Sequence, residues 1–100
     1  MEINKIYEIV ISKSANNKMY EHFDFLARVS EEAAKCLLKE LLNDIKSPKV
    51  MPHRNPTYEN SYLKIGEYRY MLSAKRYRII YKIKDNKVFV DDIQDCRQMF

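Results

Sequence analysis

Residues 76–84, Arg-Tyr-Arg-Ile-Ile-Tyr-Lys-Ile-Lys, decide the fold, because apolar and basic side chains alternate along them. Side chains two residues apart share one face of a β-strand, so this period predicts a strand. One face takes Tyr77, Ile79, Tyr81 and Ile83. The opposite face takes Ile80 and the basic residues Arg76, Arg78, Lys82 and Lys84. Such a strand is expected to lie in a sheet that packs one face on a core.

Extended segments lie on both sides of this strand. Residues 87–93 follow it through Asp85-Asn86, a good two-residue hairpin turn because both residues tolerate positive φ. Residues 68–73 precede it through Ala74-Lys75, a poorer turn pair. Residues 62–65 also read as extended, before a break near Gly66. The C-terminal half is therefore predicted to form an antiparallel meander.

The N-terminal half has a helical period after one strand at residues 5–11. We expect Ser14 to cap a helix whose inner face holds Ala15, Met19, Phe23 and Leu26. Ser30 is expected to cap a second, leucine-rich helix that ends at Lys46 or Ser47, before Pro48. Residues 47–61 contain all three prolines and are predicted to be a loop.

These elements predict one α+β domain over residues 1–100 with the order β-α-α-β-β-β. The N-terminal strand and the helical hairpin are expected to pack on a small antiparallel sheet. With 100 residues, a second domain is nearly excluded. No segment approaches the roughly 18 consecutive apolar residues of a membrane span, and the first residues lack signal-peptide character. We therefore expect a cytoplasmic protein that does not bind membranes.

The composition argues against cofactor and metal sites. The single glycine makes a phosphate-binding loop of backbone amides improbable, and no nucleotide-binding motif or zinc spacing occurs. Cys36 and Cys96 are 60 residues apart and are expected to be free thiols, with Cys36 partly buried in its helix. Asp91, Asp92 and Asp95 match no cation-binding loop, and strand alternation is expected to separate Asp91 from Asp92. We expect no cofactor and no metal.

Charge is distributed unevenly along the chain. Residues 1–47 hold seven basic and eight acidic side chains, whereas residues 48–100 hold eleven basic and six acidic ones. Residues 64–87 alone have a net charge of +6. A basic segment of this kind suits a polyanion or an acidic protein partner, and a solvated sheet face is the alternative.

Aromatic and basic residues interleave over residues 68–82, a pattern typical of surfaces that contact unpaired bases and phosphates. The simpler interpretation places Tyr77 and Tyr81 in the core. His22 is expected to be a packing or surface residue. His53 has a side chain suited to acid–base chemistry, but no second residue singles it out.

Taken together, the order of elements, the strand Arg76-Tyr77-Arg78-Ile79-Ile80-Tyr81 and the pair Tyr68-Arg69 resemble the RelE/ParE superfamily of bacterial type II toxins. The resemblance covers about residues 5–97. It implies a toxin that a co-expressed antitoxin neutralises by wrapping around it. RelE-like members cleave messenger RNA on the ribosome without a metal, whereas ParE-like members inhibit DNA gyrase and have no hydrolytic site.

For the RelE-like branch, the resemblance implies catalytic roles for Arg69, Arg78 and Arg97. Residues implied to bind the target or RNA are Lys64, Lys75, Arg76, Tyr81 and Lys82. Two departures weaken this branch, because Met71 stands where RelE has a basic residue and no C-terminal tyrosine is present. Residues 30–34 and Met51-Pro52-His53-Arg54 are more similar to ParE.

The sequence therefore favours a gyrase-binding toxin. A ribosome-dependent endoribonuclease and a non-toxic relative that only binds an antitoxin stay open as alternatives. The partners implied are the cognate antitoxin and either DNA gyrase or the ribosome with its mRNA. Whether the chain forms a homodimer is also left open.

Overall fold

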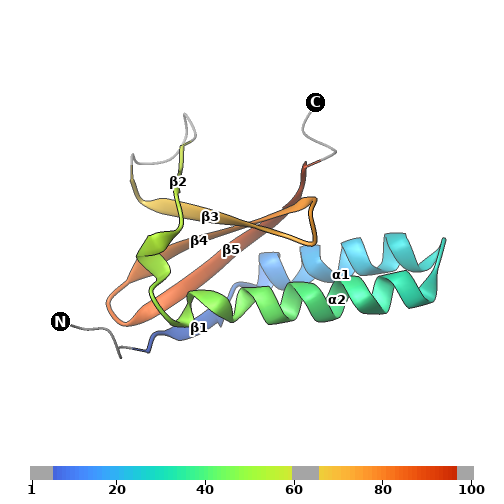
Figure 1. Ribbon diagram of the computed structural model, residues 1–100, viewed down its shortest axis with the longest axis horizontal. Coiled ribbons are helices and arrows are strands. Elements are labelled where there is room, and N and C mark those ends of the chain that lie inside the picture. The colour runs from blue at the N-terminus through green and yellow to red at the C-terminus, as the bar shows by residue number, and fades with distance from the viewer. Residues whose placement is uncertain (1–5, 60–65, 97–100) are drawn as a thin grey trace.

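The structure, a computed structural model, describes residues 6–59 and 66–96. Five strands and two long helices make up this part of the chain, in the α+β order that the sequence predicts (Figure 1). The elements are β1 (Glu8–Ile11), α1 (Lys13–Ala27), α2 (Glu31–Ile45), the short 3₁₀ helices η1 (Ser47–Lys49) and η2 (Pro52–Arg54), β2 (Thr57–Tyr58), β3 (Tyr68–Ser73), β4 (Tyr77–Lys84) and β5 (Lys87–Asp95).

The strands form one sheet in the order β1-β5-β4-β3-β2. Neighbours from β2 to β5 are antiparallel, which confirms the predicted meander. β1, however, joins the edge of the sheet and runs parallel to β5, with Ile9 opposite Val88. The sheet is therefore mixed. The helical hairpin returns the chain to the end of the sheet at which β1 begins, where the Tyr7 N–H donates to the Lys49 carbonyl.

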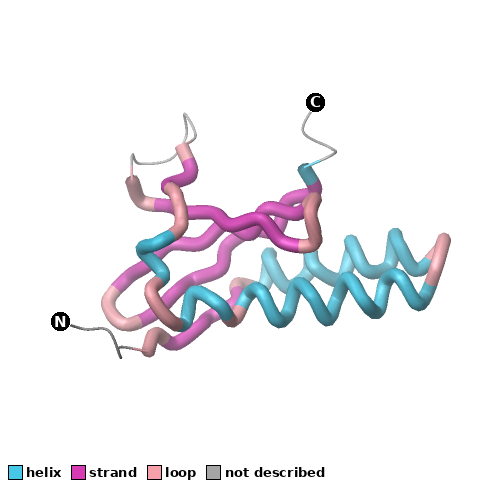
Figure 2. The backbone as a smooth tube through the Cα atoms, in the orientation of Figure 1, coloured by secondary structure: helices cyan, strands magenta, loops and turns pink. Residues whose placement is uncertain are grey.

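Both helices lie against one face of the sheet, which we call the inner face (Figure 2). The buried cluster there joins both helices to the three central strands: Ala15, Met19, Leu37, Leu41, Ile45, Met71, Tyr77, Ile79, Tyr81, Val88, Val90 and Ile93. The alternation in residues 76–84 thus predicts the core side of β4 correctly. We call the opposite side the outer face; it carries Arg78, Ile80 and Lys82.

The helical hairpin forms as its sequence predicts, with one correction at its start. Ser12, and not Ser14, caps α1, because β1 ends at Ile11 and the Ser12 Oγ accepts from the Ala15 N–H at 2.9 Å. Ser30 caps α2 as expected, and its Oγ accepts from the Ala33 N–H. α2 ends at Ile45, before Pro48, as the proline predicts.

The proline-rich stretch after α2 is more ordered than a plain loop. It contains η1, η2 and the two-residue strand β2, which extends the sheet beyond β3. Met51, between the two 3₁₀ helices, adopts the left-handed conformation with φ 52° and ψ 55°. The predicted strand at residues 62–65 lies outside the described residues.

Two tight turns join the strands of the meander. Ala74 and Lys75 both have positive φ, 52° and 66°, in the turn between β3 and β4. Neither residue is a glycine, so this turn is costly, as its poor turn composition predicts. In the turn between β4 and β5, Asp85 adopts φ 57° and accounts for the predicted hairpin at Asp85-Asn86.

A β-bulge at Asp91 interrupts β5. Ile80 faces Asp92 and Tyr81 faces Val90, so Asp91 has no opposite residue in the ladder. The extra residue shifts the alternation by one position. Before the bulge the buried residues are Val88 and Val90, and after it the next buried residue is Ile93. The predicted separation of Asp91 from Asp92 by simple alternation is therefore wrong. β5 also continues to Asp95, two residues further than expected.

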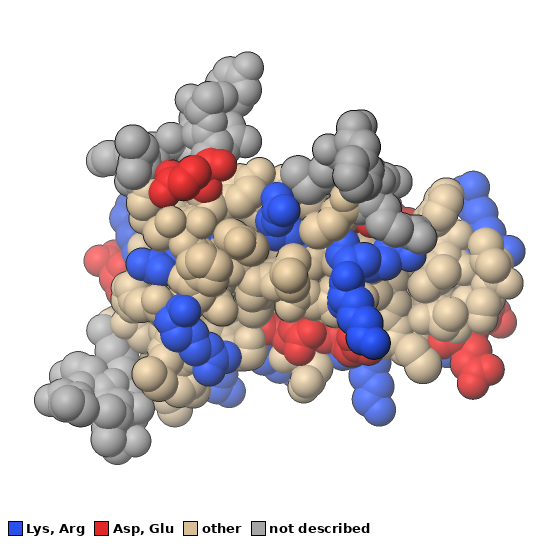
Figure 3. Space-filling view, turned by 45° about the horizontal axis from the view of Figure 1, so that its top comes forward, with Lys and Arg blue, Asp and Glu red and all other residues tan. Residues whose placement is uncertain are grey.

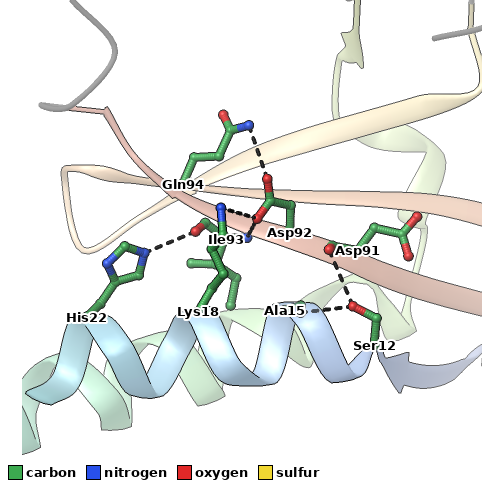
Figure 4. A network of polar contacts seen from close by, with 8 residues as sticks. All are labelled: Ser12, Ala15, Lys18, His22, Asp91, Asp92, Ile93 and Gln94. Carbon is green, nitrogen blue, oxygen red and sulfur yellow. Dashed lines mark hydrogen bonds and ion pairs between the residues drawn. The ribbon is translucent and has the colours of Figure 1, made fainter. Parts of the chain in front are cut away.

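Beyond the end of β1, the helix α1 covers the exposed edge of β5 (Figure 4). The Ser12 N–H donates to the Val90 carbonyl, and the Ser12 Oγ donates to the Asp91 carbonyl. Further along the helix, Lys18 Nζ lies 3.3 Å from the Asp92 carboxylate. His22 Nε2 then donates to the Ile93 carbonyl at 3.0 Å. Side chains of α1 thus take over where strand pairing stops.

Two smaller observations complete the fold. Cys36, predicted to be partly buried, is exposed on α2, and it and Cys96 are free thiols. In the stretches 6–59 and 66–96, no helix is long and apolar enough to cross a membrane.

Candidate functional site

Three tyrosines and two cations form a cluster on the outer face: Tyr58, Tyr68, Tyr70, Arg78 and Lys82. The Arg78 guanidinium lies 5.6 Å from the ring centre of Tyr58 and 5.3 Å from that of Tyr70. The Lys82 Nζ lies 5.6 Å from the Tyr68 ring. We call this set the outer cluster, and its spacing is that of cation–π contacts.

Strand pairing explains how the outer cluster forms. Tyr58 on β2 is opposite Tyr68 on β3, and Tyr68 is opposite Lys82 on β4. Residues opposite each other point to the same face of a sheet. Figure 3, in which the top of the view in Figure 1 comes forward, shows basic side chains separated by uncharged ones, with some acidic side chains beside them. The surface is therefore aromatic with interspersed cations, as the interleaved sequence predicts.

Tyr68 is the titratable group of this cluster that its surroundings affect most clearly. Burial, followed by a hydrogen bond to the Asp91 carboxylate and the negative charges of Asp91 and Glu67, raises the pKa of Tyr68 to about 12. Each of these effects disfavours the tyrosinate. Tyr68 is consequently a neutral hydroxyl at physiological pH, and it brings the bulged Asp91 into contact with the outer cluster.

Arg69, a predicted catalytic residue, points to the inner side of the sheet and holds the loop that contains η2. It is opposite Tyr81 in the ladder. One terminal nitrogen of its guanidinium donates to the carbonyl of Asn55 at 2.6 Å and to that of His53 at 3.1 Å. Arg69 therefore acts as an anchor for this loop.

Tyr81, predicted to bind the target, is a second anchor for the same loop. Its buried hydroxyl donates to the Pro52 carbonyl at 2.6 Å and accepts from Asn55 Nδ2 at 2.9 Å. Burial raises the pKa of Tyr81, while the Asn55 hydrogen bond and the charges of Arg69 and Arg54 oppose that rise. The core interpretation of Tyr81 is thus the one that the structure supports.

The predicted catalytic arginines do not share a surface. Arg69 is opposite Tyr81, whereas Arg78, three residues before Tyr81 on β4, is opposite Leu72. An odd separation along an uninterrupted strand pair puts two side chains on opposite faces. Arg78 belongs to the outer cluster and Arg69 to the loop anchor. Arg97 lies outside the described residues.

The remaining predicted binding residues are also dispersed. Arg76 does not join Arg78 on the outer face, because its guanidinium lies 2.8 Å from the Asp95 carboxylate and 5.0 Å from the Tyr77 ring. Lys75 is exposed in the strained turn before β4. Lys82 belongs to the outer cluster, and Lys64 lies outside the described residues.

The two histidines lie in different parts of the molecule. His22 covers the edge of β5, and its ring centre lies 4.9 Å from that of Tyr77, which confirms the packing role expected for it. His53 is exposed in η2 and makes an edge-on contact with Tyr7, the ring centres being 6.3 Å apart. Across residues 6–59 and 66–96, no three His, Cys, Asp or Glu side chains gather as a metal site would require.

Sequence reasoning missed the loop anchor, in which Asn55 joins Tyr81 and Arg69. Alternation along residues 68–73 puts Arg69 on the same face as Met71, which could have indicated an inward-facing arginine. Nothing in the sequence of residues 47–61 shows that Pro52 and Asn55 meet β4, because these contacts join residues 26 and 29 positions apart.

Comparisons with known proteins agree with this fold. The family model for the ParE toxin of the type II toxin–antitoxin system parDE matches residues 9–100. A chain from the chromosomal ParDE toxin–antitoxin system of P. aeruginosa superposes with a TM-score of 0.75 at 8% identity, covering 92% of this chain and 98% of its own. The conserved hypothetical protein HP0894 of Helicobacter pylori superposes with a TM-score of 0.58 at 14% identity, covering 95% and 100%. No curated protein matches the sequence.

Proposed function

The chain belongs to the ParE toxin family of type II toxin–antitoxin systems, and we propose that it inhibits growth by binding DNA gyrase in the cytoplasm. In this proposal a cognate antitoxin, encoded beside the toxin, holds it inactive. Inhibition is by occupation of the target, without a hydrolytic step on the toxin.

The observation that supports binding over cleavage is the placement of the two arginines. A metal-free nuclease needs several cations around one phosphate, so that developing negative charge is stabilised from fixed positions. Arg78 is on the outer face, whereas Arg69 is on the inner side and already donates to two carbonyl oxygens. Bringing both to one phosphate would require β3 or β4 to reverse its faces.

The antitoxin is expected to cover part of the outer face. Leu72 is exposed there beside the outer cluster, and the net charge of +6 over residues 64–87 suits an acidic segment. Aromatic rings, arginine and an exposed aliphatic side chain are the residue types that dominate protein interfaces.

An inhibition assay tests the proposal directly. Purified toxin is added to DNA gyrase and relaxed plasmid, and supercoiling is followed, with antitoxin added in a parallel series. Inhibition that the antitoxin reverses is expected. In cells, induction should stop DNA synthesis before translation. Full supercoiling activity at a large excess of toxin would refute the proposal.

The outer cluster favours one alternative, a ribosome-dependent endoribonuclease. Tyr58, Tyr68 and Tyr70 offer ring faces for unpaired bases, and Arg78 and Lys82 lie beside them. The test compares Arg78→Ala with Lys84→Ala, which removes an exposed cation near the end of the same strand. Under the gyrase proposal, induced cells show no new transcript cleavage with the wild-type chain. Ribosome-dependent cleavage that Arg78→Ala abolishes and Lys84→Ala leaves intact would establish the alternative instead.

A further inference from the structure

One exposed apolar patch lies at the end of the molecule where β1 begins and η1 meets η2. Ile6 is 63% exposed, Val50 42% and Met51 58%. Ile6 and Val50 are bridge partners, and Met51 follows Val50 in the chain, so the three residues lie in the same part of the molecule. We call them, with the exposed cations Lys49 and Arg54 and the exposed His53, the loop patch.

The backbone of the loop patch is held in one conformation. Tyr81 and Arg69 bind the carbonyls of Pro52, His53 and Asn55 from the sheet side, and Pro52 itself is buried. The Tyr7 N–H donates to the Lys49 carbonyl at 2.8 Å, which fixes the other end. A loop with this many anchors loses little conformational entropy when a partner binds it.

The same loop contains backbone strain. Met51 adopts φ 52°, a conformation that costs a residue with a β-carbon roughly 1–2 kcal/mol. Non-glycine residues in such conformations persist where the surroundings over-determine them, and they cluster at binding sites. Here the Met51 side chain is exposed between two 3₁₀ helices, while the next residue, Pro52, is buried.

We propose that the loop patch is the surface through which the toxin contacts its folded target, DNA gyrase. This inference rests on the proposed function and names the contact surface for it. The exposures of 42–63% leave these apolar side chains open to a partner, and a loop that is held in one conformation suits a preformed site on a folded protein. A flexible antitoxin segment would instead favour a groove or a sheet face.

Charge specifies the chemistry of the hollow. Lys49 and Arg54 flank the apolar side chains, and in the described part of the chain no acidic residue lies between positions 45 and 58. The complementary site on the partner is therefore an apolar depression with acidic residues at its rim. Met51 fills the depression, because methionine adapts its shape to irregular cavities.

The test uses a double variant, Met51→Asp with Arg54→Glu. Aspartate tolerates the left-handed conformation better than most residues, so the loop backbone is retained. The matched control is Val29→Asp with Arg28→Glu, which makes the same change in chemistry at an exposed apolar–basic pair in the α1–α2 turn. Thermal midpoints of both variants are measured first and are expected to match that of the wild type within a few degrees.

We expect the toxin concentration that halves gyrase supercoiling to rise about 30-fold or more for the loop variant, the effect of losing an interface hot spot. The control is expected to stay within about two-fold of wild type. Direct binding to gyrase by surface plasmon resonance should change by the same factors, whereas the affinity for co-expressed antitoxin stays unchanged.

Each opposing outcome has a distinct meaning. Wild-type toxin that does not inhibit gyrase would refute the proposed function, and this partner with it. A loop variant that inhibits as well as the wild type would overturn the loop patch alone. The assignment to gyrase would also be overturned if the loop variant still inhibited gyrase but had lost another interaction. Such an interaction is binding to the antitoxin, or binding to the plasmid in the absence of gyrase.

Discussion

The Tyr81→Phe substitution removes one oxygen from the centre of the loop anchor and leaves the ring in the core. The hydroxyl makes two hydrogen bonds, donating to the Pro52 carbonyl at 2.6 Å and accepting from Asn55 Nδ2 at 2.9 Å. Phenylalanine fills the same space, so no cavity forms. The loss in stability consequently reports the hydrogen bonds alone.

We expect Tyr81→Phe to lower the free energy of unfolding by about 2 kcal/mol. A buried acceptor left without a partner costs about 1–3 kcal/mol, and the Pro52 carbonyl is left so by this change. The Asn55 amide is half-buried and regains a partner in water, so its loss adds little. For a domain of this size, 2 kcal/mol corresponds to a fall in the thermal midpoint of about 10 °C.

Two measurements check this reasoning. Denaturant unfolding gives the free energy, and amide hydrogen exchange reports whether protection falls in the stretch from Met51 to Asn55 before it falls in β4. Tyr20→Phe on the exposed side of α1 is the matched control and should stay within about 0.5 kcal/mol. The anchor role would be refuted by a Tyr81→Phe protein as stable as the control, with unchanged exchange in the loop.

Three further predictions concern the meander. Lys75→Gly is expected to raise the free energy of unfolding by about 1 kcal/mol, because glycine adopts φ 66° without steric cost, and a lower denaturant midpoint would contradict it. Arg76→Met is expected to cost about 3 kcal/mol at pH 7, since it removes the guanidinium 2.8 Å from the buried Asp95 carboxylate; a loss below 1 kcal/mol would show a weak pair. Above pH 10 the unfolded chain loses the Tyr68 proton while the folded chain keeps it up to about pH 12, so stability present below pH 10 falls across this window. Tyr68→Phe should flatten an alkaline titration of the unfolding free energy, and an equally steep fall in that variant would exclude Tyr68 as the cause.

Much of the fold can be predicted from local patterns, because those patterns determine local structure. The alternation around Ile79 puts the correct face of β4 in the core, and Ser30 with Pro48 marks the limits of α2. The sequence predicts the start of α1 two residues late, since Ser12 and Ser14 are equally good caps by composition. The pairing of Ile11 with Val90 decides between them, because β1 continues to Ile11 and the helix begins directly after Ser12. Ile11 and Val90 are far apart in the sequence.

The candidate site is harder to predict from the sequence. Alternation gives the wrong sheet face for a side chain wherever a bulge or a turn interrupts the strand. The bulge at Asp91 changes which residues face the core, and no residue type in β5 indicates where the extra residue falls. Alternation predicts Arg76 on the outer face together with Arg78, but Arg76 precedes β4 and its guanidinium contacts the Asp95 carboxylate. Such placements follow from non-local charge pairing, which one sequence does not display.

The parallel pairing of β1 with β5 has a consequence for how the protein is made. β1 is synthesised before both helices, and its partner β5 is the last of the five described strands to be made, so the Ser12–Asp91 hydrogen bond spans 79 positions. Until residues 87–95 emerge, the inner side of α1 has no β5 to cover, so a nascent or truncated chain lacks the completed sheet. Completion of the sheet therefore waits for β5, and we expect that a chain cut short before β5 does not form this sheet.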